Sequence, residues 1–127
     1  MLYHPVEPIE RDKAEEIFDL GNEAAIVEAL LSLAYYEPNG RWVQEKCLAF
    51  AQRGQGDVRR IAIVCLGHLA RVHRKLDLDR VAKVFNELRD DTSVLGEIEN
   101  AVGDIRVFVD HQFDTKIASS QKKRRVN

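Results

Sequence analysis

The stretch that says most about the fold is DVRRIAIVCLGHL, residues 57–69, near the middle of the chain. Apolar residues recur through it and just beyond it with the spacing of one helical face. They are Val58, Ile61, Ala62, Cys65, Leu66, Leu69 and Val72. A stripe this wide needs a second apolar surface to cover it. The segment therefore predicts a helix over about 58–74 that is buried along one side.

Helical spacing recurs in six segments, and residues that stop or cap helices separate them. The segments cover roughly 10–20, 23–36, 41–53, 58–74, 78–89 and 93–109. No segment alternates apolar and polar residues as a half-buried strand does. The pattern predicts an all-α protein whose helices form three antiparallel pairs, over about 10–36, 41–74 and 78–109.

The second helices of the three pairs repeat with a stride of 36 residues. The aligned sets are Ile26/Ala62/Ile98, Ala29/Cys65/Ala101, Leu30/Leu66/Val102 and Leu33/Leu69/Ile105. Small residues fill one of these columns, and Gly67 matches Gly103 in the next, as expected where two helices approach closely. The first helices repeat with a stride of 38. Because such pairs cannot bury their apolar faces alone, we expect them to stack into a short right-handed solenoid.

Residues 57–69 also resemble the second-helix signature of HEAT repeats, in particular the short bacterial type found in phycobilin lyases. In that signature an Asp caps the helix, a Val-Arg pair follows, and an Ala and a Leu-Gly set the packing. The corresponding residues here are Asp57, Val58-Arg59, Ala62 and Leu66-Gly67.

The resemblance covers residues 41–109 well and residues 10–36 weakly. The third repeat departs from the signature, since Val94-Leu95 replaces Val-Arg and Gly96 comes early in the helix. The resemblance implies three HEAT-like pairs. It favours protein binding without naming a partner, because HEAT-like proteins serve many partners.

Composition sets further limits. The 127 residues are 45% hydrophobic and 31% charged, with a net charge of −2, which predicts one globular domain with no general attraction for nucleic acid or anionic membrane. Cys47 and Cys65 lie in apolar stretches and are expected to be buried free thiols. The N-terminus has no signal-peptide core, and no apolar run approaches the ~18 residues of a bilayer span. We expect a cytoplasmic protein with a single HEAT-like domain over residues 1–110.

Residues 111–127 are mostly polar and basic, and their sizeable apolar residues are Phe113, Ile117 and Val126. We interpret them as a C-terminal tail, either a loose helix or disordered. Truncation near residue 111 is expected to be tolerated unless Phe113 makes the segment a cap.

No pattern typical of a catalytic or metal site is present. The four histidines are scattered, and His68 and His73 are five residues apart, on different faces of one helix. Cys47 aligns with an apolar core position, and Ser32 lies in no nucleophile elbow. The sequence therefore predicts no catalytic residue, no metal and no cofactor, and a protein that is not an enzyme.

In HEAT-like solenoids the second helices line the concave surface, so their columns outside the core are the expected contact surface. Those columns include Val64 and Val107. The candidate partner-binding residues are Glu28, Ser32, Tyr35, Tyr36, Arg60, His68, Arg71, Asn100 and Asp104. Tyr35, Tyr36 and Arg71 lead this set, because Tyr and Arg are frequent interface anchors. Trp42 is either a further anchor or part of the core between repeats.

Three functions remain open. The first is an immunity protein that binds and neutralises a cognate bacterial toxin, which fits the small size, the absence of a catalytic set and the abundant carboxylates. The second is a scaffold, adaptor or chaperone-like HEAT protein of a larger complex or enzyme. The third is nucleic-acid binding through the basic middle repeat, which the acidic repeats on both sides oppose. The sequence leaves the partner's identity and the oligomeric state open.

Overall fold

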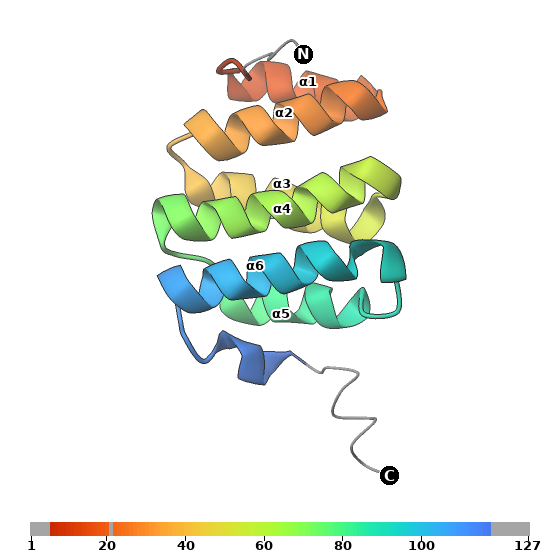
Figure 1. Ribbon diagram of the computed structural model, residues 1–127. Coiled ribbons are helices and arrows are strands. Elements are labelled where there is room, and N and C mark those ends of the chain that lie inside the picture. The colour runs from red at the N-terminus through yellow and green to blue at the C-terminus, as the bar shows by residue number, and fades with distance from the viewer. Residues whose placement is uncertain (1–5, 21, 118–127) are drawn as a thin grey trace, which may run out of the picture.

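The computed structural model describes residues 6–20 and 22–117, and this part of the chain is helical without a strand (Figure 1). Its helices are α1 (Arg11–Leu20), α2 (Glu23–Tyr36), α3 (Gly40–Arg53), α4 (Gly56–His73), α5 (Leu78–Glu87) and α6 (Leu95–Phe108). Two short 3-10 turns, η1 (Thr92–Val94) and η2 (Phe113–Lys116), precede and follow α6. The predicted all-α class is confirmed.

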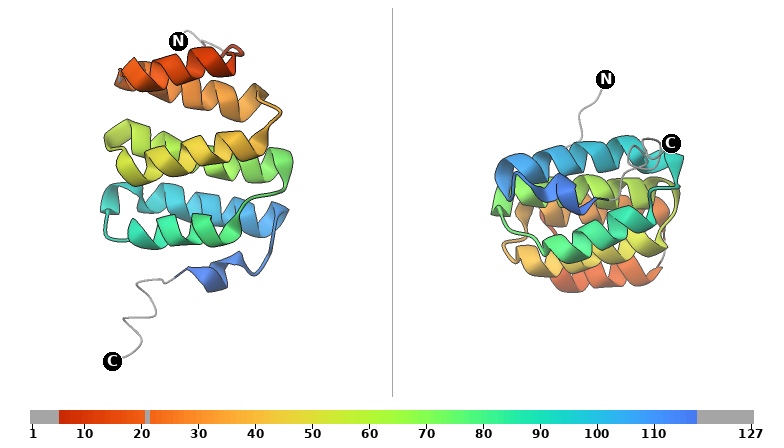
Figure 2. Two further views of the ribbon diagram at one scale, coloured as in Figure 1. Left: turned by 180° about the vertical axis from the view of Figure 1, so that it is seen from behind. Right: turned by 90° about the horizontal axis from the view of Figure 1, so that it is seen from below.

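The helices form two layers. Helices α2, α4 and α6 lie side by side in one layer, with α4 packed between the other two, and α1, α3 and α5 form the layer behind them (Figures 1 and 2). The pairs follow one another along a single axis, from α1–α2 at one end to α5–α6 at the other. This arrangement agrees with the predicted stack of pairs. The right hand and the HEAT-like character of the solenoid stay predictions.

Side chains cap the N-termini of several helices by accepting backbone hydrogen bonds. Asn22 accepts a hydrogen bond from the backbone N–H of Ala25, and Asn39 accepts one from Trp42. These bonds satisfy amides that have no partner within the first turn of a helix. The capping residues account for the agreement between the predicted and observed starts of α2 and α3.

Helix α4 begins differently from the HEAT-like signature. Its cap position is Gln55, without a side-chain cap bond, and the helix starts at Gly56. Gly56 has a φ of 55°, which glycine adopts without steric cost, so the chain turns into the helix before Asp57. The expectation that Asp57 caps α4 is therefore wrong. Asp57 lies in the first turn and forms an ion pair with Arg60.

The columns that repeat with a stride of 36 form the core. Three of them are buried at every position: Ile26/Ala62/Ile98, Ala29/Cys65/Ala101 and Leu33/Leu69/Ile105. Cys47 and Cys65 are both buried and free, as predicted. A hydrogen bond to Cys65, together with burial, raises the pKa of Cys47 well above its usual value. The Cys47 thiol is therefore neutral and packs as a small apolar group.

The core continues beyond residue 110. Phe113 in η2 is fully buried, and its ring meets that of Phe85 edge to face, with centroids 6.4 Å apart. The interpretation of residues 111–117 as a tail is therefore wrong, because Phe113 covers the end of the core on α5 and α6. Residues 118–127, which include the basic run Lys122–Arg125, lie outside the described residues.

Candidate functional site

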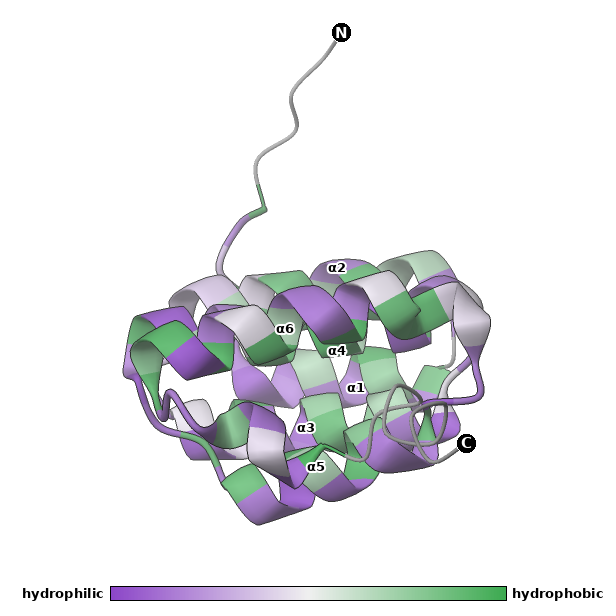
Figure 3. Ribbon diagram, turned by 60° about the horizontal axis from the view of Figure 1, so that its bottom comes forward, coloured by the Kyte–Doolittle hydropathy of each residue, from purple (hydrophilic) through white to green (hydrophobic). Residues whose placement is uncertain are grey.

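Exposed apolar side chains gather on the layer of second helices. The exposed large apolar residues of the described chain are Tyr35, Tyr36, Val64, Val72, Leu95 and Val107 on α2, α4 and α6, and Leu20 on α1. We call the outward side of α2, α4 and α6 the second-helix face. Figure 3 shows apolar and polar residues mixed along it. The other layer carries ion pairs between successive elements, such as Lys46–Glu15 and Arg80–Glu45.

Four of the predicted contact residues form a continuous chain across the second-helix face. The ring of Tyr35 on α2 packs edge-on against His68 on α4, with centroids 4.5 Å apart. Arg71 Nη2 lies 3.1 Å from His68 Nδ1, and Arg71 Nη1 donates to the Asp104 carboxylate on α6. The structure thus brings Tyr35, His68, Arg71 and Asp104 together.

The hydrogen bond between Arg71 and His68 fixes the state of the imidazole. A guanidinium has only donors, so Nδ1 of His68 must accept and carry no proton. Burial lowers the pKa of His68, and the positive charge of Arg71 lowers it further. The ring is therefore neutral at pH 7, with its proton on Nε2.

A glycine permits this arrangement. A Cβ at Gly67 would lie 2.9 Å from Asp104 Oδ2 and 3.3 Å from the Cα of Ala101, so α6 approaches α4 closely here. A Cβ at the aligned Gly103 would meet nothing within 4 Å, so this position of α6 is open. Gly67 thus places the Asp104 carboxylate within reach of Arg71.

A second bridge joins the starts of α4 and α6. Arg60 pairs with Asp57, and its Nε lies 3.5 Å from Glu97 Oε2. The Arg60 guanidinium is therefore already paired with carboxylates of the chain itself. Glu28 and Asn100, which align at the stride of 36, are exposed on the same face.

Two predicted residues contact the segment that precedes α1. The Ser32 hydroxyl donates to the carbonyl of Glu7 at 2.5 Å, and the Tyr36 hydroxyl donates to the carbonyl of Val6 at 2.9 Å. Ser32 is only 2% exposed, whereas Tyr36 remains 51% exposed. Placing Ser32 on the contact surface was therefore wrong, because residues 6–9 lie across this side of α2.

Trp42 belongs to the packing between pairs. It is partly buried against the core on α3, in the layer behind the second-helix face. The Lys46 ammonium and the Arg11 guanidinium lie 5.2 and 5.4 Å from its ring centre. These positions favour the core interpretation of Trp42 over the anchor.

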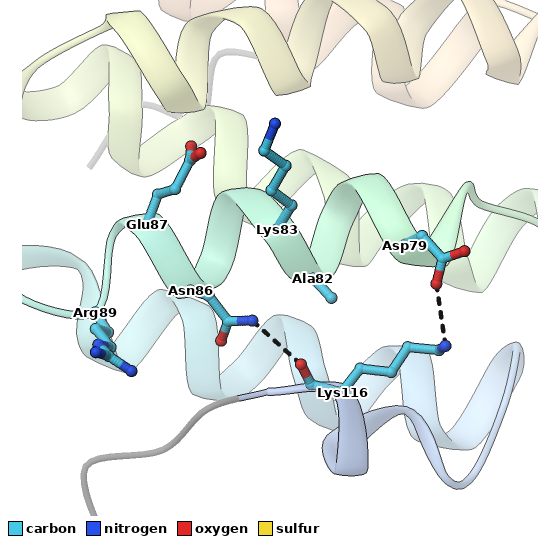
Figure 4. Close-up of a pocket in the computed structure, with 7 residues that line it drawn as sticks. All are labelled: Asp79, Ala82, Lys83, Asn86, Glu87, Arg89 and Lys116. Atoms are coloured by element: carbon cyan, nitrogen blue, oxygen red, sulfur yellow. Dashed lines mark hydrogen bonds and ion pairs between the residues drawn. The ribbon is translucent and has the colours of Figure 1, made fainter.

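A surface depression lies where η2 packs against α5. It is lined by Asp79, Ala82, Lys83, Asn86, Glu87, Arg89 and Lys116 (Figure 4). Asn86 donates to the carbonyl of Lys116, and the Lys116 ammonium donates to Asp79 at 3.0 Å. These bonds attach the C-terminal turn to α5, and the other side chains point apart. The arrangement supplies no converging set of catalytic groups.

Within the residues that the structure describes, no three or more His, Cys, Asp or Glu side chains are grouped so that they can hold a metal ion. Within residues 6–20 and 22–117, no helix combines the length and the apolar character that a bilayer span requires.

Comparison with solved structures gives an informative similarity. No protein-family model matches the chain, and no curated protein matches it. A chain in the crystal structure of a CDI complex from Cupriavidus taiwanensis LMG 19424 is 30% identical, with a TM-score of 0.75. The match covers 85% of this chain and 97% of that one. The two chains belong to one family. The likeness spans nearly all of the Cupriavidus chain and therefore concerns the whole stack, not one helix pair.

Proposed function

We propose that this protein is a non-catalytic immunity protein, which binds and neutralises the toxin of a contact-dependent inhibition (CDI) system. The observation that carries the proposal is the 30% identity to a chain found in a CDI complex. The match covers 85% of this chain and 97% of that chain. A chain of the same family with the same fold is expected to take the same kind of partner, a protein.

The second-helix face supports this role. Its exposed tyrosines and valines surround arginines that ion pairs hold in place, and Tyr and Arg are enriched in the cores of protein interfaces. Binding to such a face needs no catalytic group. We propose Tyr35, Tyr36, Arg71 and their neighbours as the toxin contact, without the buried Ser32.

Co-expression tests the proposal. The protein encoded beside this chain is expressed in a bacterial host with and without the chain, and growth is recorded. We expect growth arrest by the neighbour alone, rescue by this chain, and a 1:1 complex in size-exclusion chromatography. An arrest that this chain does not relieve, with no complex formed, would overturn the proposal.

The other two functions receive less support. Three arginines of the middle pair, Arg59, Arg60 and Arg71, are engaged with carboxylates of the chain, as in Arg59–Asp91 at 2.9 Å, which leaves them less available to phosphate groups. No feature of the described chain favours a scaffold over an immunity protein. Recovery of several subunits of one assembly, in place of a single toxin, would support the scaffold.

A further inference from the structure

The arginines within helices α2, α4 and α6 already form ion pairs with carboxylates of the chain. Helices α2, α4 and α6 contain four arginines and no lysine. The pairs are Arg59–Asp91, Arg60–Asp57, Arg60–Glu97, Arg71–Asp104 and Arg106–Asp114. The guanidinium of each of these four arginines therefore lies beside a carboxylate of the chain itself.

Glu28 differs from these residues. It is exposed on α2, and within the described chain it forms no ion pair. Glu28 and Glu7 line one depression, in which Ile9, Ala25 and Ala29 provide apolar surface. Two carboxylates at the rim and an apolar wall suit a lysine or arginine, whose stem is aliphatic and whose head is cationic.

Exposed apolar residues also lie on α2, α4 and α6. At the stride of 36, Glu28 aligns with Val64 on α4, and Tyr35 aligns with Val107 on α6. These three apolar side chains are 40% (Val64), 52% (Tyr35) and 73% (Val107) exposed. An apolar area of this kind is typical of the centre of a protein interface, with charges at its rim.

We propose that the toxin docks on the second-helix face through an apolar surface bordered by a lysine or arginine. The apolar surface covers Tyr35, Val64 and Val107, and the basic side chain enters the depression at Glu7 and Glu28. Charge complementarity and the exposed apolar residues of the same face select this partner chemistry. The inference rests on the proposed immunity function and adds the chemistry of the partner's surface.

Affinity measurements on five forms of the full chain test the inference. The wild type and the variants Glu28→Lys, Glu28→Gln, Val107→Asp and Asp19→Lys are titrated with the protein encoded beside the chain, at low and high salt. Asp19 is an exposed acid at the end of α1, in the other layer, and serves as the matched control for charge reversal. Circular dichroism and the Tm verify that each variant is folded, since all three altered positions are exposed.

We expect Glu28→Lys and Val107→Asp to weaken binding about tenfold or more, because they oppose the partner's cation and its apolar surface. Glu28→Gln should weaken binding less and make it less sensitive to salt. Asp19→Lys should leave the dissociation constant within about twofold of wild type, as a charge outside the contact does.

Each contrary outcome has a distinct meaning. If Glu28→Lys binds as tightly as wild type or more tightly, no basic side chain of the partner binds at Glu28. If Val107→Asp leaves the affinity unchanged, the partner does not dock on the second-helix face. If the wild type forms a dimer that Val107→Asp dissociates, the face binds a second copy of this chain, and the inference is overturned. Wild type that neither binds nor protects would overturn the proposed function itself.

Discussion

His68 lies where the three second helices meet, between Tyr35 on α2 and Arg71, which bonds Asp104 on α6. Its folded-state pKa lies below the usual value of 6.5 because of burial and the charge of Arg71. The unfolded chain therefore takes up this proton at a higher pH than the folded chain. The contribution of His68 to stability is present above pH 6.5 and declines as the pH falls below it.

An NMR titration of the histidine rings checks this expectation. The His68 midpoint should lie below 6.5, and Arg71→Ala should raise it, since a positive charge is lost while Asp104 remains. A wild-type midpoint above 6.5, or a downward shift in the variant, would contradict the proposed hydrogen bond.

Single residues also show what the sequence could not predict about the site. The stride of 36 placed Tyr35, His68, Arg71 and Asp104 on neighbouring helices, and the structure joins them. Ser32 was misplaced because the segment that buries it, residues 6–9, has no periodicity that would indicate where it packs.

At the scale of elements, the approach of α4 to α6 depends on Gly67 and not on the aligned Gly103. Gly67→Ala should lower the free energy of unfolding by about 1 kcal/mol or more, since its Cβ would crowd Ala101 and the paired Asp104. Gly103→Ala should raise it by about 0.5–1 kcal/mol, because the site is open and alanine favours the helix. Urea unfolding measures both changes. Equal effects of the two substitutions would contradict the close approach.

The C-terminal turn η2 behaves as part of the core. Phe113→Ala should cost about 3–5 kcal/mol of unfolding free energy, because it empties a fully buried site against Phe85. Exposed His111→Ala is the control and should change it by less than about 0.5 kcal/mol. If both variants unfold at the same urea concentration as wild type, η2 does not close the core.

Helices were easier to predict than their connections. Helix α2 was predicted at its observed bounds, because Asn22 caps it and apolar spacing continues to its end. Between α5 and α6, Asp91 accepts a hydrogen bond from the amide of Ser93 and stabilises the turn η1, whereas the helical spacing predicts one continuous helix over 93–109. The burial of Phe113 depends on Phe85, and no local pattern connects the two residues.

At the scale of the whole molecule, the two layers have different tasks in this account. Ion pairs such as Glu45–Arg80 link successive helices of the layer formed by α1, α3 and α5, and the hydrogen bond from Arg80 lowers the pKa of Glu45. The second-helix face combines most of the exposed apolar residues with arginines that are already paired. We therefore propose that the layer of α1, α3 and α5 supports the fold and that the layer of α2, α4 and α6 binds the partner.

Hydrogen exchange of the chain, alone and in complex with the proposed toxin, the protein encoded beside it, tests this assignment most directly. We expect the toxin to slow exchange of amides in α2, α4 and α6 and to leave those of α1, α3 and α5 nearly unchanged, because binding stabilises the elements it covers. Protection concentrated on α1, α3 and α5, with α2, α4 and α6 exchanging as in the free chain, would contradict the account.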